Sequence, residues 1–188
     1  MVSVKIRTTA YWMLFIVLLA GCGNTMGDLN PSGLDKRPPV EPGSIGTEVG
    51  QISPDFTISD THGNDVTLSS IVPTAQGVVL YFTMWCTLCK GDMSQMQSSA
   101  IPAFPNVRFY AVDYVSGTVA EAAAAEAENS AYTTGFTVLA DTHQILSGNS
   151  GLYKGTMGIV VVIDRNGVIR MNEEYKAARL QSVLLTLP

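Results

Sequence analysis

Cysteine is scarce in this sequence, with three residues among 188, at positions 22, 86 and 89. Small secreted domains that depend on disulfides for stability need several pairs, so this chain is not one of them. Basic residues are also few, with 11 Lys and Arg against 16 Asp and Glu. This acidic balance disfavours nucleic acid and anionic lipid headgroups as partners, and we predict neither.

The apolar run near the N-terminus is short. It follows Lys5 and Arg7 and extends from Ala10 to Ala20. A run of this length is too short to span a bilayer comfortably, and basic residues before a short apolar core are the layout of an export signal. We therefore predict that residues 1–21 are a signal peptide and no part of the fold.

The run ends in the sequence Leu-Leu-Ala-Gly-Cys, from Leu18 to Cys22. This ending resembles the lipobox of bacterial lipoproteins, in which the cysteine is diacylated on sulfur and becomes the new N-terminus. The resemblance implies cleavage before Cys22 and a lipid anchor in place of a spanning helix. The residue after the lipidated cysteine is Gly23 and not an aspartate. By resemblance to Gram-negative lipoproteins, this implies sorting to the outer membrane if the host is Gram-negative. The alternative is a plain signal peptide or signal anchor with a chance cysteine.

Residues 22–53 have the composition of a linker. They contain several Pro and Gly residues and follow neither a helical nor an alternating pattern. Such a segment behaves as a flexible chain, so we predict a tether that lets the domain move away from the membrane surface. The remaining residues, 54–188, suit one globular domain with an ordinary core.

Short strands and helices alternate along residues 54–188. Asp55–Ser59 and Val66–Leu68 alternate apolar and polar side chains around a Gly-Asn-Asp turn, which predicts a β-hairpin. The elements predicted after it are a buried strand at Val78–Thr83, a helix with Cys89, Met93, Met96 and Ala100 on one face, a strand at Val107–Val112, a helix from Thr118 to about Ala131, strands at Gly158–Asp164 and Val168–Met171, and a helix at Lys176–Leu187. This order predicts an α/β fold with a central mixed sheet flanked by helices.

Cys86 and Cys89 lie three residues apart where a strand is predicted to lead into a helix. Their sulfurs are then neighbours on one turn and can form or open a small disulfide ring. The free N–H groups and the positive end of the helix dipole favour the thiolate of Cys86, which predicts that Cys86 is the nucleophile. Cys89, on the apolar face, would resolve the mixed disulfide. This redox-active disulfide is the only redox group that we predict, with no other cofactor and no resident metal.

The segment VVLYFTMWCTLCKGDM resembles the strand, Trp-Cys-x-x-Cys motif and helix of thioredoxin-like proteins, especially the membrane-tethered reductases of cytochrome c maturation and sporulation. The start of the domain, GQISPDFTISD, resembles the opening of the redoxin superfamily. The resemblance covers residues 50–187 and implies a thioredoxin-like fold. It also implies that Trp85 shields the cysteines and contacts substrates, and that Asp92 carries a proton to or from Cys89. Alternatively, Asp92 only complements the helix dipole.

One departure from the family pattern concerns the predicted substrate contact. Relatives have Thr and a cis Pro before the strand predicted at Gly158–Asp164, where this chain has Thr156 and Met157. A cis bond before Met costs about 3 kcal/mol, so we expect a trans bond. In relatives this position packs against the disulfide and hydrogen-bonds the substrate backbone, so Thr156 and Met157 are candidate substrate contacts of an altered kind.

Two further departures concern proton transfer and redox direction. Leu80 stands where thioredoxins carry a buried acid, which leaves Asp92 as the better proton acceptor. Thr87 and Leu88, between the cysteines, include no His to stabilise a thiolate as in strongly oxidising relatives. We therefore expect a reductant.

These features predict a thiol-disulfide oxidoreductase of the cell envelope, lipid-anchored on the periplasmic or extracytoplasmic face. Its expected partners are the thiols and disulfides of envelope proteins and an electron donor in the membrane or periplasm. The alternative is that the Cys86–Cys89 disulfide is purely structural, but a disulfide that closes so short a loop stabilises a protein little.

A peroxiredoxin-like thiol peroxidase is a second interpretation. Thr83 lies three residues before Cys86, as in the peroxidatic motif. That family also needs a Pro earlier in the loop and an Arg near the later strand, where this chain has Val79 and Met157.

A Cu(I) carrier is a third interpretation. Soft sulfur ligands select Cu(I), and Met84 or Met157 would join Cys86 and Cys89 around the metal. Against it, methionines near a core are more often packing residues.

Overall fold

The computed structural model describes residues 39–188. The predicted signal peptide, the predicted lipidation site Cys22 and the tether as far as residue 38 lie outside the described residues. Within the described part of the chain, no helix is both long and apolar enough to cross a membrane.

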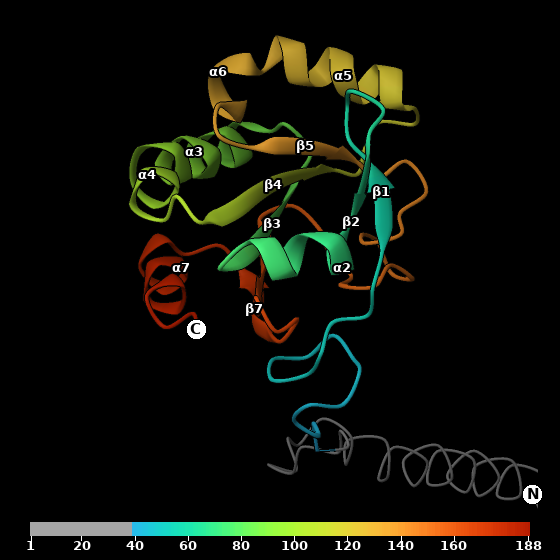
Figure 1. Ribbon diagram of the computed structural model, residues 1–188. Coiled ribbons are helices and arrows are strands. Elements are labelled where there is room, and N and C mark those ends of the chain that lie inside the picture. Colours follow the sequence, from blue (N-terminus) through green and yellow to red (C-terminus); the bar gives the residue numbers. More distant parts are fainter. Residues whose placement is uncertain (1–38) are drawn as a thin grey trace, which may run out of the picture. The chain divides into compact units, whose positions relative to one another are not determined.

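A five-stranded mixed sheet forms the centre of the domain (Figure 1). Its strands lie in the order β5 (Thr137–Ala140), β4 (Val107–Asp113), β3 (Gly77–Thr83), β6 (Ile159–Asp164) and β7 (Ile169–Glu174). β4 runs parallel to β3 and to β5, whereas β6 runs antiparallel to β3 and to β7. Every residue of β3 is buried, because β3 is the central strand and both faces of the sheet are covered.

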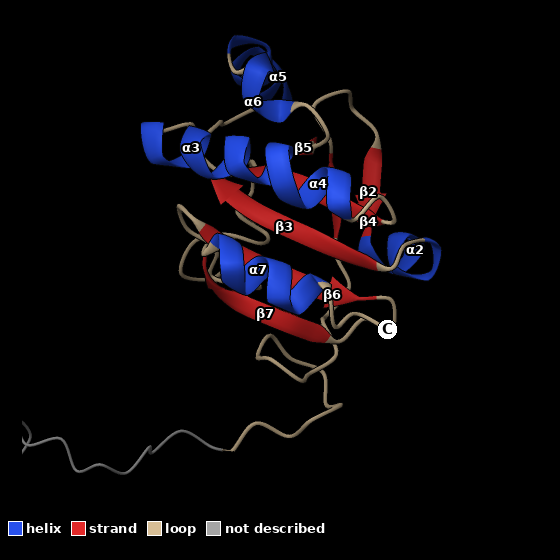
Figure 2. Cartoon of the chain, turned by 90° about the vertical axis from the view of Figure 1, so that its left-hand side faces the viewer, coloured by secondary structure: helices blue, strands red, loops and turns tan. Residues whose placement is uncertain are grey.

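Helices pack around this sheet. They are α2 (Leu68–Ile71), α3 (Thr87–Gln95), α4 (Ile101–Ala103), α5 (Val119–Glu128), α6 (Ser130–Thr133) and α7 (Ala177–Leu184). A π-helical turn at Met96–Ala100 joins α3 to α4. Figure 2 shows α3, α4 and α7 on one side of the sheet. The predicted thioredoxin-like arrangement, a mixed sheet flanked by helices, is confirmed.

Side chains of β3 alternate between the two faces of the sheet, as expected for a strand. Val79 and Tyr81 point to the face covered by α3 and α7, where they share a core with Cys89. Leu80 and Phe82 point to the opposite face, which the N-terminal hairpin covers. Leu80 is therefore an ordinary core residue on the face away from α3.

The predicted hairpin is present as β1 (Thr57–Ser59) and β2 (Asp65–Thr67), paired antiparallel. Three short elements were not predicted, namely β5, α2 and a 3₁₀ turn at Val72–Thr74, and the helix predicted from Thr118 is divided at Asn129 into α5 and α6. These differences are confined to short segments and leave the order of the longer elements unchanged.

Residues 50–53, which the sequence assigns to the flexible tether, instead pair with the outer edge of the sheet. The N–H of Gly50 donates to the carbonyl of Ile169, and the N–H of Ile169 donates to the carbonyl of Gln51, both at 2.9 Å. The N–H of Ser53 donates to the carbonyl of Gly167 at 2.8 Å. The ordered chain thus begins before residue 54, because β7 offers unpaired backbone groups at the sheet edge.

Candidate active site

The chain turns sharply between the end of β3 and the start of α3. Trp85 has a φ of +61°, in the left-handed region that side chains rarely adopt, and its N–H donates to the hydroxyl of Thr83 at 3.0 Å. Cys86 is the N-cap of α3, and its Sγ accepts from the N–H of Cys89 at 3.2 Å. The turn therefore holds the Cys86 sulfur against the free N–H groups of the first helical turn.

The two cysteine sulfurs lie side by side at this turn. The Sγ atoms of Cys86 and Cys89 are 2.8 Å apart, and both residues are free thiols. A disulfide has a sulfur separation of about 2.05 Å, so a small rotation of the side chains would close the ring. Cys86 is partly exposed, whereas Cys89 has no exposed surface and packs in the core with Met93. Cys86 is thus the sulfur that a protein partner can reach.

The surroundings of Cys86 lower the pKa of its thiol. Burial acts to raise this pKa, but hydrogen bonds from the Cys89 side chain and from the backbone N–H groups of Cys89 and Leu88 outweigh it. The charge of Asp92 also acts to raise the pKa of Cys86, without reversing the net direction. At neutral pH a larger fraction of Cys86 is thiolate than in an ordinary cysteine.

Asp92 is connected to the sheet through Tyr81. The hydroxyl of fully buried Tyr81 donates to Oδ2 of Asp92 at 2.9 Å. Burial and the charge of Glu174 raise the pKa of Asp92, and the hydrogen bond from Tyr81 lowers it by less. Burial, followed by the hydrogen bond to Asp92, raises the pKa of Tyr81, so its hydroxyl keeps its proton and donates a hydrogen bond to the Asp92 carboxyl.

Asp113, at the end of β4, holds Trp85 in place. Its Oδ2 accepts from the indole Nε1 of Trp85 at 3.0 Å. The carboxylate also accepts from the N–H groups of Val115 and Ser116 and from the Ser116 hydroxyl, so both oxygens of this buried acid are hydrogen-bonded. The indole is therefore fixed next to the cysteines and does not depend on its own backbone alone for orientation.

The loop before β6 brings Met157 to the cysteines. The Sδ of Met157 lies 3.4 Å from the Sγ of Cys86. No peptide bond in the described residues is cis, so the bond before Met157 is trans, as expected from the sequence. The loop is attached to the sheet through Gly158, whose N–H donates to the carbonyl of Phe82 at 3.0 Å and whose carbonyl accepts from the N–H of Tyr175 at 2.7 Å.

Exposed apolar side chains flank the cysteines. Met84, Leu88, Val115 and Met157 expose 40–59% of their surface and form what we call the apolar rim. Thr156 is exposed as well, and its carbonyl accepts from the N–H of Ile159 at 3.0 Å, within a turn of its own chain. Of the predicted site residues, Cys89 and Met157 thus contact Cys86, and Asp92, further along α3, contacts Tyr81. Thr156 uses its carbonyl within its own loop.

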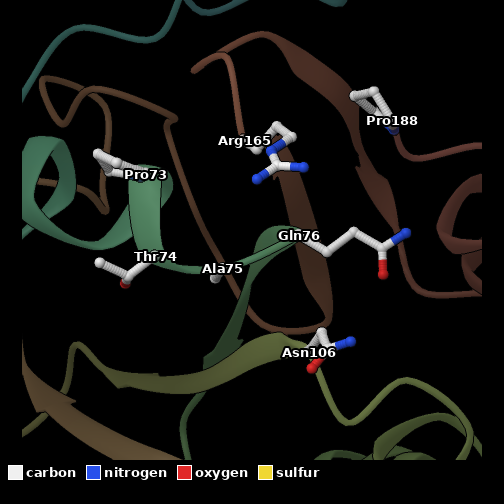
Figure 3. A pocket seen from close by; sticks show the side chains of 7 residues that line it. All are labelled: Pro73, Thr74, Ala75, Gln76, Asn106, Arg165 and Pro188. Carbon is white, nitrogen blue, oxygen red and sulfur yellow. The ribbon is translucent and has the colours of Figure 1, made fainter.

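A second feature of the described surface lies away from the cysteines. A polar hollow of about 470 Å³ lies at the opposite end of β3 from the cysteines (Figure 3). Its lining residues are Pro73, Thr74, Ala75, Gln76, Asn106, Arg165 and Pro188, which include no thiol. Within residues 39–188, no group of three or more His, Cys, Asp or Glu residues is placed to hold a metal ion.

Tyr81 and Asp113 belong to the site but are not predicted from the sequence. Each is a polar residue in an otherwise largely apolar strand. Because buried hydroxyl and carboxyl groups need hydrogen-bond partners, such residues indicate that a hydrogen bond exists, but the sequence does not identify the partner.

The family of the chain follows from the sequence match of this domain. Residues 49–172 match the model of the AhpC/TSA family, and the chain belongs to this family. None of the curated protein sequences compared with it is a match.

Solved structures resemble the fold at low sequence identity. DsbF of MTB, determined in mixed oxidised and reduced forms, is 23% identical with a TM-score of 0.57, covering 71% of this chain and 95% of its own. A secreted disulfide oxidoreductase of Mycobacterium tuberculosis, described as homologous to DsbE of E. coli, is 20% identical with a TM-score of 0.56, covering 70% and 96%. A thiol:disulfide interchange protein from Bacteroides sp. is 19% identical with a TM-score of 0.55, covering 74% and 90%. These likenesses establish the shared fold.

We predict that Tyr81→Phe raises the pKa of Asp92, because the lost hydrogen bond stabilised the carboxylate. The variant should also lose about 1 kcal/mol of unfolding free energy at neutral pH. This loss should shrink as the pH falls below the pKa of Asp92, because a protonated carboxyl accepts the Tyr81 hydrogen bond less strongly. Carboxyl NMR titration and urea unfolding at several pH values measure both effects.

The matched control for this prediction is Tyr110→Phe, which removes the hydroxyl of a tyrosine that packs in the core on the opposite face of the sheet. It should leave the Asp92 titration unchanged. An Asp92 pKa that stays constant in Tyr81→Phe would show that the hydroxyl does not control this carboxyl.

Proposed function

We propose that this protein is a thiol-disulfide oxidoreductase that exchanges disulfides through Cys86 and Cys89. The observation that carries the proposal is the 2.8 Å approach of an exposed sulfur with a lowered pKa to a buried second sulfur at a helix N-terminus. An attacking thiolate and a protected resolving thiol are the two groups that exchange requires. A purely structural disulfide would not need one of its cysteines to be partly exposed and to have a lowered pKa.

In the reducing direction, the Cys86 thiolate attacks one sulfur of a substrate disulfide. A mixed disulfide forms, and the other substrate sulfur leaves as a thiolate that takes up a proton. Cys89 then gives its proton to the Asp92 carboxylate, with Tyr81 orienting that carboxylate, and attacks the Cys86 sulfur. The substrate leaves with two electrons, and Cys86 and Cys89 are left as a disulfide for a separate electron donor to reduce.

Reduction is the direction that we propose. The residues between the cysteines, Thr87 and Leu88, offer no positive charge that would stabilise the reduced thiolate strongly, and the charge of Asp92 disfavours it. A dithiol that is stabilised less gives up its electrons more readily. The names of the structural neighbours, which include a disulfide oxidoreductase and a thiol:disulfide interchange protein, support exchange without deciding direction.

Protein thiols and disulfides of the cell envelope are the proposed substrates. The apolar rim and Trp85 offer an apolar surface around Cys86, which suits a polypeptide segment flanking a cysteine. Because the Thr156 carbonyl is used within its own turn, we expect substrates to be held more by apolar contacts than by backbone pairing at this loop.

A peroxidase function receives less support, although the AhpC/TSA family match is compatible with it. The Thr83 hydroxyl accepts from the N–H of Trp85, and Thr83 is fully buried. The thioether of Met157 lies next to Cys86 at the position where the peroxiredoxin pattern needs an Arg to stabilise the developing charge.

The exchange mechanism predicts that Cys89→Ser accumulates mixed disulfides with partner proteins, because the resolving thiol is missing. Non-reducing gels followed by mass spectrometry would identify the adducts on Cys86. The matched variant Cys86→Ser should trap nothing and should lose reductase activity on a protein disulfide. Adducts that form with Cys86→Ser and not with Cys89→Ser would reverse the two roles.

We also propose that the protein is a lipoprotein anchored through Cys22 on the outer side of the cytoplasmic membrane or, in a Gram-negative host, in the outer membrane. The support is the lipobox-like sequence before Cys22 and the secreted neighbour of Mycobacterium tuberculosis. An exported location suits the activity, because protein disulfides form and persist outside the cytoplasm.

Cys22→Ser should abolish anchoring, because lipidation and cleavage depend on that sulfur. Cell fractionation should find a released protein or an uncleaved precursor, whereas Cys86→Ser should remain at the membrane with the mature mass. A Cys22→Ser protein of mature mass that stays with the membrane would contradict the lipid anchor.

A further inference from the structure

Three sulfur atoms converge at the N-terminus of α3. The Sγ of Cys86 lies 2.8 Å from the Sγ of Cys89 and 3.4 Å from the Sδ of Met157. The sequence leaves both Met84 and Met157 as candidate neighbours of the cysteines. The structure brings the sulfur of Met157 into contact with Cys86, whereas the Met84 side chain is 44% exposed on the turn before the cysteines.

These donors are all soft. Two thiolates and a thioether select Cu(I) over hard cations, and Cu(I) is satisfied by two or three sulfur ligands. Zn²⁺ prefers four ligands from Cys, His, Asp and Glu in a structural site. Within the described residues, no three of these side chains are grouped suitably, so the donor set fits Cu(I) better than Zn²⁺.

The third sulfur is held by the sheet and not by a loose loop. Next to Met157, Gly158 is hydrogen-bonded on both sides, to Phe82 of β3 and to Tyr175 after β7. On the other side of Met157, Gly155 packs so closely on Phe82 that a Cβ at this position would lie 2.1 Å from the ring. Ligands fixed before the metal arrives bind it with less loss of conformational freedom.

The exposure of the three residues also gives a route for the metal. Met157 is 40% exposed and Cys86 is partly exposed, whereas Cys89 has no exposed surface. A metal arriving from solvent, or from a second protein docked on the apolar rim, would meet Met157 and Cys86 first and Cys89 last. Transfer of Cu(I) between sulfur ligands can then proceed one ligand at a time.

We propose that the reduced protein binds one Cu(I) through the thiolates of Cys86 and Cys89 and the thioether of Met157. Binding releases the thiol protons and changes no oxidation state, so it needs no oxidant or reductant. The site goes beyond the exchange function and does not depend on it. Because both thiolates become ligands, bound Cu(I) and disulfide exchange exclude each other.

The test is an anaerobic titration of the reduced protein with Cu(I) in competition with a chromophoric Cu(I) chelator. Met157→Leu should weaken Cu(I) binding about 10-fold to 100-fold, whereas the matched variant Met84→Leu should bind like the wild type. X-ray absorption should count three sulfurs around copper in the wild type and in Met84→Leu, and two in Met157→Leu. Circular dichroism checks that each variant is folded.

Equal Cu(I) affinity in the wild type and in folded Met157→Leu, with two sulfurs around copper in both, would overturn the three-sulfur site. Zn²⁺ titrations provide a second discriminating result, because Met157→Leu should not change Zn²⁺ affinity, and an equal loss for both metals would contradict a Cu(I)-selective site. Exchange is measured separately on the metal-free wild type. Failure of Cu(I) binding with exchange intact overturns this inference alone, and Cu(I) binding without exchange overturns the proposed function alone.

Discussion

The position of Cys86 as the N-cap of α3, directly after a fully buried strand, is the constraint on which the rest of the site depends. A capping sulfur faces the N–H groups of the first helical turn, which favour its negative charge. The helical spacing then places Cys89 one turn deeper, in the core and within 2.8 Å of the first sulfur. One local geometry thus provides an accessible acidic thiol and a protected thiol next to it.

The groups around the cysteines have pKa values displaced in opposite directions. Hydrogen bonds lower the pKa of Cys86, whereas burial raises the pKa of Asp92, so one group readily gives up a proton and the other readily holds one. Such opposed shifts are typical of sites that carry out acid–base chemistry. Tyr81, on the central strand β3, donates a hydrogen bond to Asp92, which ties the proposed proton acceptor to the sheet.

Local sequence patterns predict the parts of this structure that depend on local interactions. The hairpin, the buried strand β3, the helix after the cysteines and the spacing of the pair are all visible in periodicity and turn residues. Two contacts of the site could not be predicted in this way: the hydrogen bond of Tyr81 to Asp92 and that of Trp85 to Asp113. Each joins two different elements and depends on how those elements pack. Strand β5 is short, and residues 43–53 bond to one another and to the chain at residues 167–169, so neither segment carries a strong local signal.

The central claim is that Cys86 and Cys89 interconvert reversibly between dithiol and disulfide. The most direct measurement equilibrates the metal-free protein in glutathione buffers of graded redox ratio, quenches it with acid, and determines the state of both cysteines by alkylation and mass spectrometry. The account predicts a single two-electron transition in which both thiols disappear together and return on reversal of the buffer. Two thiols that persist across the whole range, or a glutathione adduct on Cys86 that Cys89 never resolves, would contradict it.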